Sequence, residues 1–247
     1  NRLIENYRNY ITSFLNIKDP GISKFVDEEI QNKKLWPDPL VQFNPTYESG
    51  NALKTLTKEK VLHPELEKIF IGYELYKHQE EAIRLGTSGS EFIVTSGTGS
   101  GKSLTYMATI FSYILIHKEH VEGQNLAVIV YPMNALINSQ NEEIKKYERN
   151  YLKSSLPKGV SYDDSNKPLD EQIKDLKDIV GDIFPVKYAQ YTGQEDEETR
   201  EAIRKNPPHI LLTNYMMLEL IMTRGGKDVE IRNAILENIQ FLVFDEL

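Results

Sequence analysis

The sequence predicts an α/β domain with a parallel β-sheet covered by helices on both faces, preceded by a mainly helical N-terminal leader. From residue 73 onward, short apolar runs alternate with longer segments whose apolar residues recur at helical spacing. That alternation is typical of βαβ units, which build a parallel sheet. The run at 126–131 is continuously apolar, as expected for a strand that is buried on both faces.

Each element of this pattern can be placed in order. The expected strands are residues 92–95, 126–131, 186–191, 209–213 and 241–245. The expected helices around them are residues 77–86, 102–118, 134–150, 195–205, 215–224 and 229–237. We interpret the charged stretch at 152–184 as a surface insertion that carries its own helix at 169–179.

Residues 1–72 form the leader, and residues 73–247 form the α/β domain. Apolar spacing predicts leader helices at 3–16 and 22–33 and a short helix within 56–70. The leader shows no obvious apolar core of its own. We therefore expect it to pack on the domain that follows.

Composition excludes several classes of protein before any motif is considered. The 247 residues carry a formal net charge of −8, which argues against a generally basic surface for nucleic acid. The chain has no cysteines, so disulfides and cysteine-bound zinc are excluded within it, and a reducing, cytoplasmic location is expected. No apolar run reaches the roughly 18 residues that a membrane-spanning helix needs, so no membrane partner is expected.

Both ends of the sequence resemble cut points. The start lacks Met and already follows a helical pattern, and Leu247 comes directly after an apolar strand and two acids. A domain rarely ends at the tip of a buried strand. We therefore expect a piece of a longer protein that is truncated inside a motif.

A glycine-rich segment between a predicted strand and a predicted helix is the strongest functional signal. It reads Ser96, Gly97, Thr98, Gly99, Ser100, Gly101, Lys102 and Ser103. The glycines permit a tight turn that aims backbone N–H groups inward, and these groups favour an anion at the helix N-terminus. Lys102 adds a point charge for nucleotide phosphates, and the Ser103 hydroxyl is a ligand for Mg²⁺. The segment therefore predicts a nucleotide-phosphate loop, although Ser96 stands where Gly is usual.

Two acids at the end of the last apolar strand complement this loop. Asp245 and Glu246 directly follow the apolar residues 241–244. Because the carboxyl ends of parallel strands meet at one edge of a sheet, we expect the acids and the loop to lie together there. Taken alone, the acids would also fit a solvated turn after a strand.

Together the two motifs resemble those of superfamily 2 helicases of the DExD/H-box kind, over residues 73–247. The resemblance implies a P-loop, RecA-like domain that binds ATP and Mg²⁺ and hydrolyses ATP. It implies that Lys102 contacts the phosphates, that Asp245 holds Mg²⁺ through water, and that Glu246 polarises the attacking water.

Four further segments match this family in order. Gln79 matches a glutamine that reads adenine, and Tyr76 or Tyr73 is the candidate to stack on the base. The other three segments would contact a nucleic-acid backbone through Pro132, Asn134, Thr192, Gly193, Thr213 and Asn214. Such contacts to phosphates are expected to be independent of base sequence and sensitive to salt.

The branch of the family is indicated by finer features. Segments Trp36–Pro39 and Asn44–Tyr47 look like those of bacterial and archaeal DNA helicases of repair and phage defence. The resemblance implies the N-terminal motor lobe of an ATP-dependent nucleic-acid helicase or translocase, with DNA as the expected partner. A second RecA-like domain outside this sequence would supply an arginine finger, so the chain alone is expected to bind nucleotide weakly and to hydrolyse it slowly or not at all.

Three alternatives stay open. A non-helicase P-loop ATPase shares the phosphate loop but lacks the upstream glutamine and the three strand-end segments. A catalytically idle scaffold would not need to keep Lys102, Asp245 and Glu246. A translocase subunit of a restriction or phage-defence system shares the ATPase chemistry and differs in attached domains.

Overall fold

The computed structural model describes residues 2–32, 46–97, 99–163 and 166–246, which form two compact units, Asn1–Thr46 and Tyr47–Leu247. The first unit contains helices α1 (Arg2–Thr12) and α2 (Pro20–Gln31), so both expected leader helices are present with shifted ends. The predicted segment Trp36–Pro39 lies outside the described residues.

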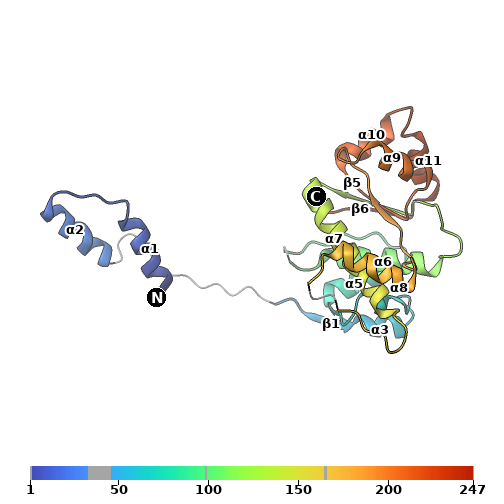
Figure 1. Cartoon of the computed structure of the whole chain (residues 1–247), viewed down its shortest axis with the longest axis horizontal. Coiled ribbons are helices and arrows are strands. Elements are labelled where there is room, and N and C mark those ends of the chain that lie inside the picture. The colour runs from blue at the N-terminus through green and yellow to red at the C-terminus, as the bar shows by residue number, and fades with distance from the viewer. Residues whose placement is uncertain (1, 33–45, 98, 164–165, 247) are drawn as a thin grey trace. The chain divides into compact units, whose positions relative to one another are not determined.

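The second unit is an α/β domain in which single strands are separated by one or two helices along the chain (Figure 1). Its helices are α3 (Leu53–Lys58), α4 (Leu66–Ile69), α5 (Lys77–Thr87), α6 (Lys102–Ile116), α7 (Asn134–Ser154), α8 (Leu169–Val180), α9 (Glu197–Lys205), α10 (Tyr215–Thr223) and α11 (Val229–Asn238). Its strands are β1 (Ser49–Ala52), β2 (Glu74–Tyr76), β3 (Ala127–Tyr131), β4 (Tyr188–Gln190), β5 (Ile210–Asn214) and β6 (Phe241–Phe244).

The main sheet consists of four parallel strands in the order β4–β5–β3–β6. Tyr131 of β3 lies opposite Asn214 of β5, and Val130 lies opposite Phe244 of β6. The three strands therefore end level with one another. This brings the segments that follow them to one edge of the sheet, where ligands of open parallel sheets bind.

Helices cover both faces of this sheet. On one face, Ile129 of β3 packs in a cluster with apolar side chains of α6 and α7. On the other, Val128 and Val130 pack with those of α9, α10 and α11, which Figure 1 shows gathered beside β5 and β6. The predicted α/β fold with a two-sided parallel sheet is confirmed. None of the described helices combines the length and apolar character needed to cross a bilayer.

The strand expected at 92–95 is a wrong prediction. These residues are described and have irregular backbone, and Ile93 is 87% exposed. Among the described strands, β6 pairs with β3 alone, and Leu242 of β6 is 52% exposed. An apolar run becomes a strand when a neighbouring strand satisfies its backbone hydrogen bonds. Residues 92–95 have the composition of a strand but no such neighbour within the described part of the chain.

Residues 53–70 contribute apolar side chains to the core of the α/β domain, so this part of the predicted leader packs on the domain that follows, as expected. β1 and β2 pair antiparallel, an arrangement that the sequence pattern did not predict. Leu66 and Phe70 are buried, and the Phe70 ring stacks on Phe111 of α6 at a centroid distance of 5.9 Å. Burying one such side chain stabilises the fold by roughly 1.5–3 kcal/mol. The domain boundary at residues 72 and 73 stays a prediction, while the compact units divide at residues 46 and 47.

The helix expected within the insertion at 152–184 is present as α8. It packs along α7 through a small apolar cluster of Leu152, Ile173 and Leu176. Two ion pairs connect the same helices, Lys177 with Glu148 at 2.7 Å and Lys145 with Asp170 at 2.7 Å. Within the described residues, the insertion therefore adds one helix, α8, that packs against α7.

Candidate nucleotide-binding site

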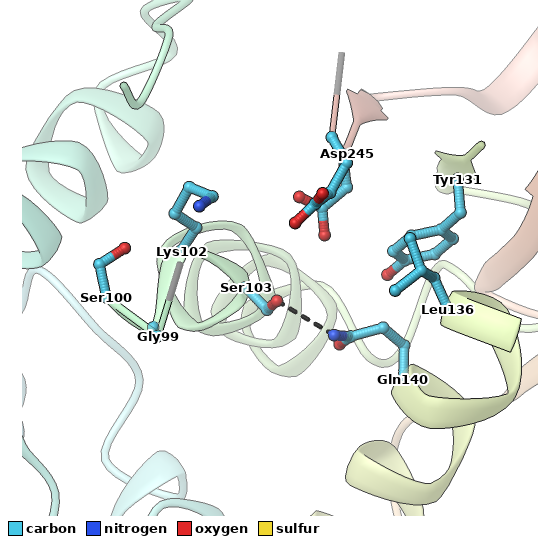
Figure 2. A pocket seen from close by; sticks show the side chains of 10 residues that line it. Gly99, Ser100, Lys102, Ser103, Tyr131, Leu136, Gln140 and Asp245 are labelled. Atoms are coloured by element: carbon cyan, nitrogen blue, oxygen red, sulfur yellow. Dashed lines mark hydrogen bonds between the residues drawn. The ribbon is translucent and has the colours of Figure 1, made fainter. Parts of the chain in front are cut away.

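A cavity of about 240 Å³ lies at the carboxyl edge of the sheet, beside the N-terminus of α6. Its lining residues are Gly99, Ser100, Gly101, Lys102, Ser103, Tyr131, Leu136, Gln140, Asp245 and Glu246. Figure 2 shows Lys102 and Ser103 at the start of α6, with the Asp245 side chain pointing toward the same space. The loop and the acids, which lie far apart in the sequence, therefore share one cavity.

Two glycines give the loop its shape. Gly99 and Gly101 have φ angles of 78° and 69°, in the left-handed region that favours glycine. Gly101 also stands at the N-cap of α6, and a β-carbon at this position would collide with Nε2 of Gln79. Position 101 therefore requires glycine for both backbone conformation and space. Thr98, predicted to belong to the loop, lies outside the described residues.

The Lys102 ammonium is held inside the loop. Its Nζ donates hydrogen bonds to the carbonyl oxygens of Ser96 at 3.1 Å and Gly97 at 3.4 Å. The hydroxyls of Ser96 and Ser100 lie 2.6 Å apart and connect the two ends of the loop. Because the partners of Lys102 are neutral carbonyls, a phosphate can replace them and form a stronger, charge-assisted hydrogen bond.

Two tyrosine hydroxyls organise the carboxylate side of the cavity. Tyr106 of α6 donates a hydrogen bond to Oδ2 of Asp245 at 2.9 Å and lies 3.2 Å from the Tyr131 hydroxyl. Burial raises the pKa of Tyr106, and the neighbouring Tyr131 and Asp245 raise it further. Burial also raises the pKa of Tyr131. Both phenols are therefore neutral donors at neutral pH, and the sequence motifs gave no signal for their contact with Asp245.

Gln140 reaches the cavity from α7, and the sequence motifs did not identify this residue as functional. Its Nε2 donates a hydrogen bond to Oγ of Ser103 at 3.2 Å, which Figure 2 draws as a dashed line. The other amide atom, Oε1, is buried and has no hydrogen-bond partner within the described residues. Gln140 thus places a buried, unpartnered acceptor next to the predicted Mg²⁺ ligand.

A second cavity of about 380 Å³ adjoins the first, because Gly101, Ser103 and Gln140 line both. The residues predicted to surround adenine, Gln79, Tyr76 and Tyr73, also line this second cavity. The sequence therefore placed its base-recognition residues beside the predicted phosphate loop, and the structure brings them to a common cavity system.

Gln79 connects α5 to the phosphate loop. Its buried amide donates from Nε2 to the carbonyl oxygens of Gly101 at 2.9 Å and Ser100 at 3.2 Å. Its Oε1 accepts a hydrogen bond from the backbone N–H of Tyr76 at 2.8 Å. The Tyr47 ring lies 5.2 Å from that of Tyr76, a neighbour that sequence reasoning missed. The contact between Gln79 and adenine stays a prediction.

The residues predicted to contact nucleic acid lie at the end of β5 or shortly after β3 and β4, at the same edge of the sheet. Pro132 and Gly193 are exposed. Asn214 donates from Nδ2 to Oδ1 of Asn134 at 2.8 Å, and its own Oδ1 accepts from the Met217 N–H and caps α10. The segments after β3 and β5 are thus joined side by side.

The two predicted threonines are engaged within the chain. Thr213 is fully buried, and its hydroxyl donates to the carbonyl oxygen of Tyr191 at 2.7 Å. The Glu195 carboxylate accepts hydrogen bonds from the Thr192 hydroxyl at 2.8 Å and from the Thr192 N–H at 2.5 Å. Phosphate contacts by these threonines stay a prediction.

The geometry of loop, acids and sheet edge agrees with a comparison to known families. The sequence model described as DEAD/DEAH box helicase matches residues 76–247. This chain belongs to the DEAD/DEAH box helicase family.

Curated relatives are much longer than this member of the family. The chain is 29% identical over 218 residues to the Druantia protein DruE of Escherichia coli, which covers 83% of this chain and 11% of that protein. It is 27% identical over 177 residues to an ATP-dependent helicase of Methanocaldococcus jannaschii, covering 72% of this chain and 21% of that protein. The chain therefore spans about a fifth or less of the length of these relatives.

Solved structures share the fold of this helicase-family domain. The DUF1998 helicase MrfA, in a crystal structure bound to DNA and AMPPNP, superposes with a TM-score of 0.56 at 19% identity over 88% of this chain and 25% of that one. The DEAD-box helicase Mss116, bound to ssRNA and UDP-BeF, superposes with a TM-score of 0.52 at 18% identity over 81% of this chain and 42% of that one. These similarities confirm the predicted RecA-like α/β fold.

Proposed function

We propose that this chain is the N-terminal motor lobe of an ATP-dependent helicase or translocase that acts on DNA. The observation that carries the proposal is the meeting of Lys102 and Ser103 with Asp245 and Glu246 around one cavity. A loop lysine, a hydroxyl and two acids at the end of a sheet are the parts that phosphoryl transfer needs for positioning and charge neutralisation.

The chain's own residues would bind ATP across the two adjoining cavities. The ammonium of Lys102 and the N–H groups of Gly99, Ser100 and Gly101 would hold the phosphates. The adenine would enter the second cavity, which Tyr73, Tyr76 and Gln79 line. Gln79 also fixes the loop through its bond to the Gly101 carbonyl, so base recognition and loop shape depend on the same side chain.

The donor set also suits Mg²⁺. Ser103 and Asp245 present hydroxyl and carboxylate oxygens, the hard ligands that this cation prefers, and the buried Oε1 of Gln140 lacks a partner within the described residues. When bound, Mg²⁺ neutralises charge on the phosphates. Tyr106 holds one carboxylate oxygen of Asp245 and thereby fixes the orientation of that carboxylate. Glu246 would accept a proton from the attacking water and orient it.

A nucleic-acid strand would pass along the edge formed by Pro132, Asn134, Thr192, Gly193, Thr213 and Asn214. The level ends of β3 and β5 and the bond between Asn134 and Asn214 support a continuous surface there. Contacts would go to phosphates through backbone N–H groups and exposed polar atoms, with the buried Thr213 supporting the strand end. Such binding would be independent of base sequence and would weaken with salt.

The proposal also concerns the longer protein to which this chain would belong. A second RecA-like domain would supply the arginine that completes catalysis, so the chain alone would bind ATP weakly and hydrolyse it slowly or not at all. A translocase subunit of a restriction or phage-defence system is the second candidate, because it shares the ATPase chemistry and differs only in attached domains. The family match over residues 76–247 disfavours a non-helicase P-loop ATPase.

A titration with a fluorescent ATP analogue and Mg²⁺ tests the proposal, with Lys102→Ala as the comparison. We expect saturable binding that the variant loses and that adenine nucleotides displace better than guanine nucleotides. Binding that is equal in wild type and variant would overturn the assignment of the phosphate loop.

A further inference from the structure

Gln140 connects the two cavities of the nucleotide site. It lies on α7, which begins at Asn134, one of the residues predicted to contact nucleic acid. Its side chain lines both cavities. Its Nε2 donates to the Ser103 hydroxyl at 3.2 Å. The opposite amide atom, Oε1, is buried and has no partner within the part of the chain that the structure describes.

The unpartnered oxygen is the unusual feature. Buried polar atoms in native proteins almost always have a hydrogen-bond partner, and the exceptions call for a ligand or a functional explanation. Oε1 of Gln140 is an acceptor, so its missing partner must be a donor. The Gln140 side chain lines the same cavity as Lys102, Ser103 and Asp245, so a small rotation of its amide would present Oε1 to a donor that binds among these groups.

We propose that Gln140 positions the Mg²⁺ that accompanies ATP. Its N–H group fixes the Ser103 hydroxyl and occupies one of the two lone pairs on Oγ, which leaves the other lone pair for the cation. Its carbonyl oxygen would accept a hydrogen bond from a water molecule on the bound Mg²⁺, because Mg²⁺ keeps several waters when it binds with phosphates. This role rests on the proposed function of the cavity as an ATP site. It adds a residue outside the phosphate loop and the acidic pair.

A purely structural role for Gln140 makes a different prediction. In that case the bond to Ser103 only holds α7 against α6, and its loss would affect nucleotide binding equally with and without Mg²⁺. Partners of metal ligands, in contrast, change the affinity for the metal. The ratio of nucleotide affinity with Mg²⁺ to affinity in EDTA therefore separates the two roles.

The test titrates a fluorescent ATP analogue into the 247-residue chain at saturating Mg²⁺ and in EDTA. We expect Gln140→Leu to weaken binding about three- to tenfold in Mg²⁺, the effect of one hydrogen bond, and to leave binding in EDTA unchanged. Gln140→Glu keeps an acceptor and adds a negative charge, so it should give a higher Mg²⁺-to-EDTA ratio than Gln140→Leu. Asn141→Leu makes the same polar-to-aliphatic change on the next residue of α7, outside the residues that line the cavities, and should keep the wild-type ratio.

The outcomes distinguish this inference from the proposed function. If wild type binds the analogue, Lys102→Ala does not, and Gln140→Leu keeps the wild-type ratio, the inference fails and the ATP site stands. A loss of affinity in Gln140→Leu that is equal in Mg²⁺ and EDTA also overturns it. If wild type and Lys102→Ala bind alike, the ATP site itself fails and the inference with it. Thermal unfolding of each variant establishes that the ratios compare folded proteins.

Discussion

The cavity beside the phosphate loop and the ends of β3, β4 and β5 share one edge of the sheet. Their polar side chains differ in the hydrogen-bond partners that they have within the chain. In the cavity, Lys102 contacts neutral loop carbonyls, and Gln140 keeps a buried acceptor oxygen without a partner among the described residues. At the strand ends, Thr213 is bonded to the Tyr191 carbonyl, and Thr192 is bonded to a carboxylate of its own chain.

This difference indicates how each region would respond to a ligand. Phosphates entering the cavity would replace weak contacts or fill open ones. A nucleic-acid phosphate at Thr192 would first have to displace Glu195, which already occupies the N–H and hydroxyl that an anion would use. A phosphate in the cavity would exchange only contacts to neutral carbonyls, whereas a phosphate at Thr192 would have to displace a carboxylate.

The largest effect is expected from Gly101→Ala. The φ angle of 69° strains any side chain, and the new β-carbon would collide with Gln79. We expect the free energy of unfolding to fall by about 1–3 kcal/mol and affinity for an ATP analogue to fall at least tenfold, roughly the equilibrium equivalent of that strain. Thermal unfolding and fluorescence titration measure the two effects.

Gly123→Ala is the matched control for this change. Gly123 has a φ angle of 73° and precedes β3, at the opposite end of the sheet from the cavity. The Gly123→Ala protein should lose stability through backbone strain and keep its affinity for nucleotide. Equal losses of affinity in both variants would show that the effect at position 101 is general unfolding.

Thr213→Val sharpens the comparison at the strand ends. Valine keeps the shape but removes the buried bond to the Tyr191 carbonyl, so we expect a loss of about 1–2 kcal/mol in the free energy of unfolding. Thr213→Ser keeps the hydroxyl and should retain most of that stability. Urea denaturation measures both variants. A Thr213→Val protein of wild-type stability that binds single-stranded DNA more weakly would show that the hydroxyl contacts the strand instead.

Glu195→Gln tests whether the Glu195 carboxylate competes with a nucleic-acid phosphate for Thr192. Removing its charge should raise affinity for a fluorescent single-stranded DNA about two- to fivefold at low salt, a range typical of exposed charges, and the gain should shrink as salt increases. Glu198→Gln removes the same charge from the first turn of α9, three residues further along the chain. It should have a smaller effect on DNA affinity. Equal gains in both variants would contradict a specific contact at Thr192.

The smallest effect is a pH dependence of the free energy of unfolding. It comes from His209, which precedes β5 at the opposite edge of the sheet from the cavity. Burial lowers the pKa of His209, and the charge of Lys187 lowers it further, so the folded state favours neutral imidazole. The resulting stability is fully present above the ordinary histidine pKa of about 6.5 and is lost as pH falls through the lowered value. His209→Gln should flatten this dependence in thermal unfolding and leave nucleotide affinity unchanged. An unaltered pH profile in the variant would rule out His209 as its source.

Much of this architecture could be predicted from the sequence because it depends on local patterns. The alternation of apolar runs and helical spacing located α5 to α11 and four parallel strands. The glycine spacing and the acids after an apolar run identified both walls of the cavity. These features are written in consecutive residues, and helix starts and tight turns follow from them.

Features that depend on pairing across the chain could not be predicted in this way. Residues 92–95 have the composition of a strand, but periodicity does not reveal whether a partner strand is present. Residues 53–70 looked like a leader because their apolar side chains meet Phe111 and its neighbours only in three dimensions. The contacts of Tyr106 with Asp245 and of Gln140 with Ser103 likewise join residues that are distant in sequence and carry no local signal.

Hydrogen exchange followed by mass spectrometry, with and without an ATP analogue and Mg²⁺, tests the central claim most directly. We expect protection in residues 96–103, around Gln140 and at residues 241–246, with little change at Thr192 and Thr213 until single-stranded DNA is added. Lys102→Ala should lose that protection. Protection confined to the strand ends, or none that depends on Lys102, would contradict the assignment of the cavity as the ATP site.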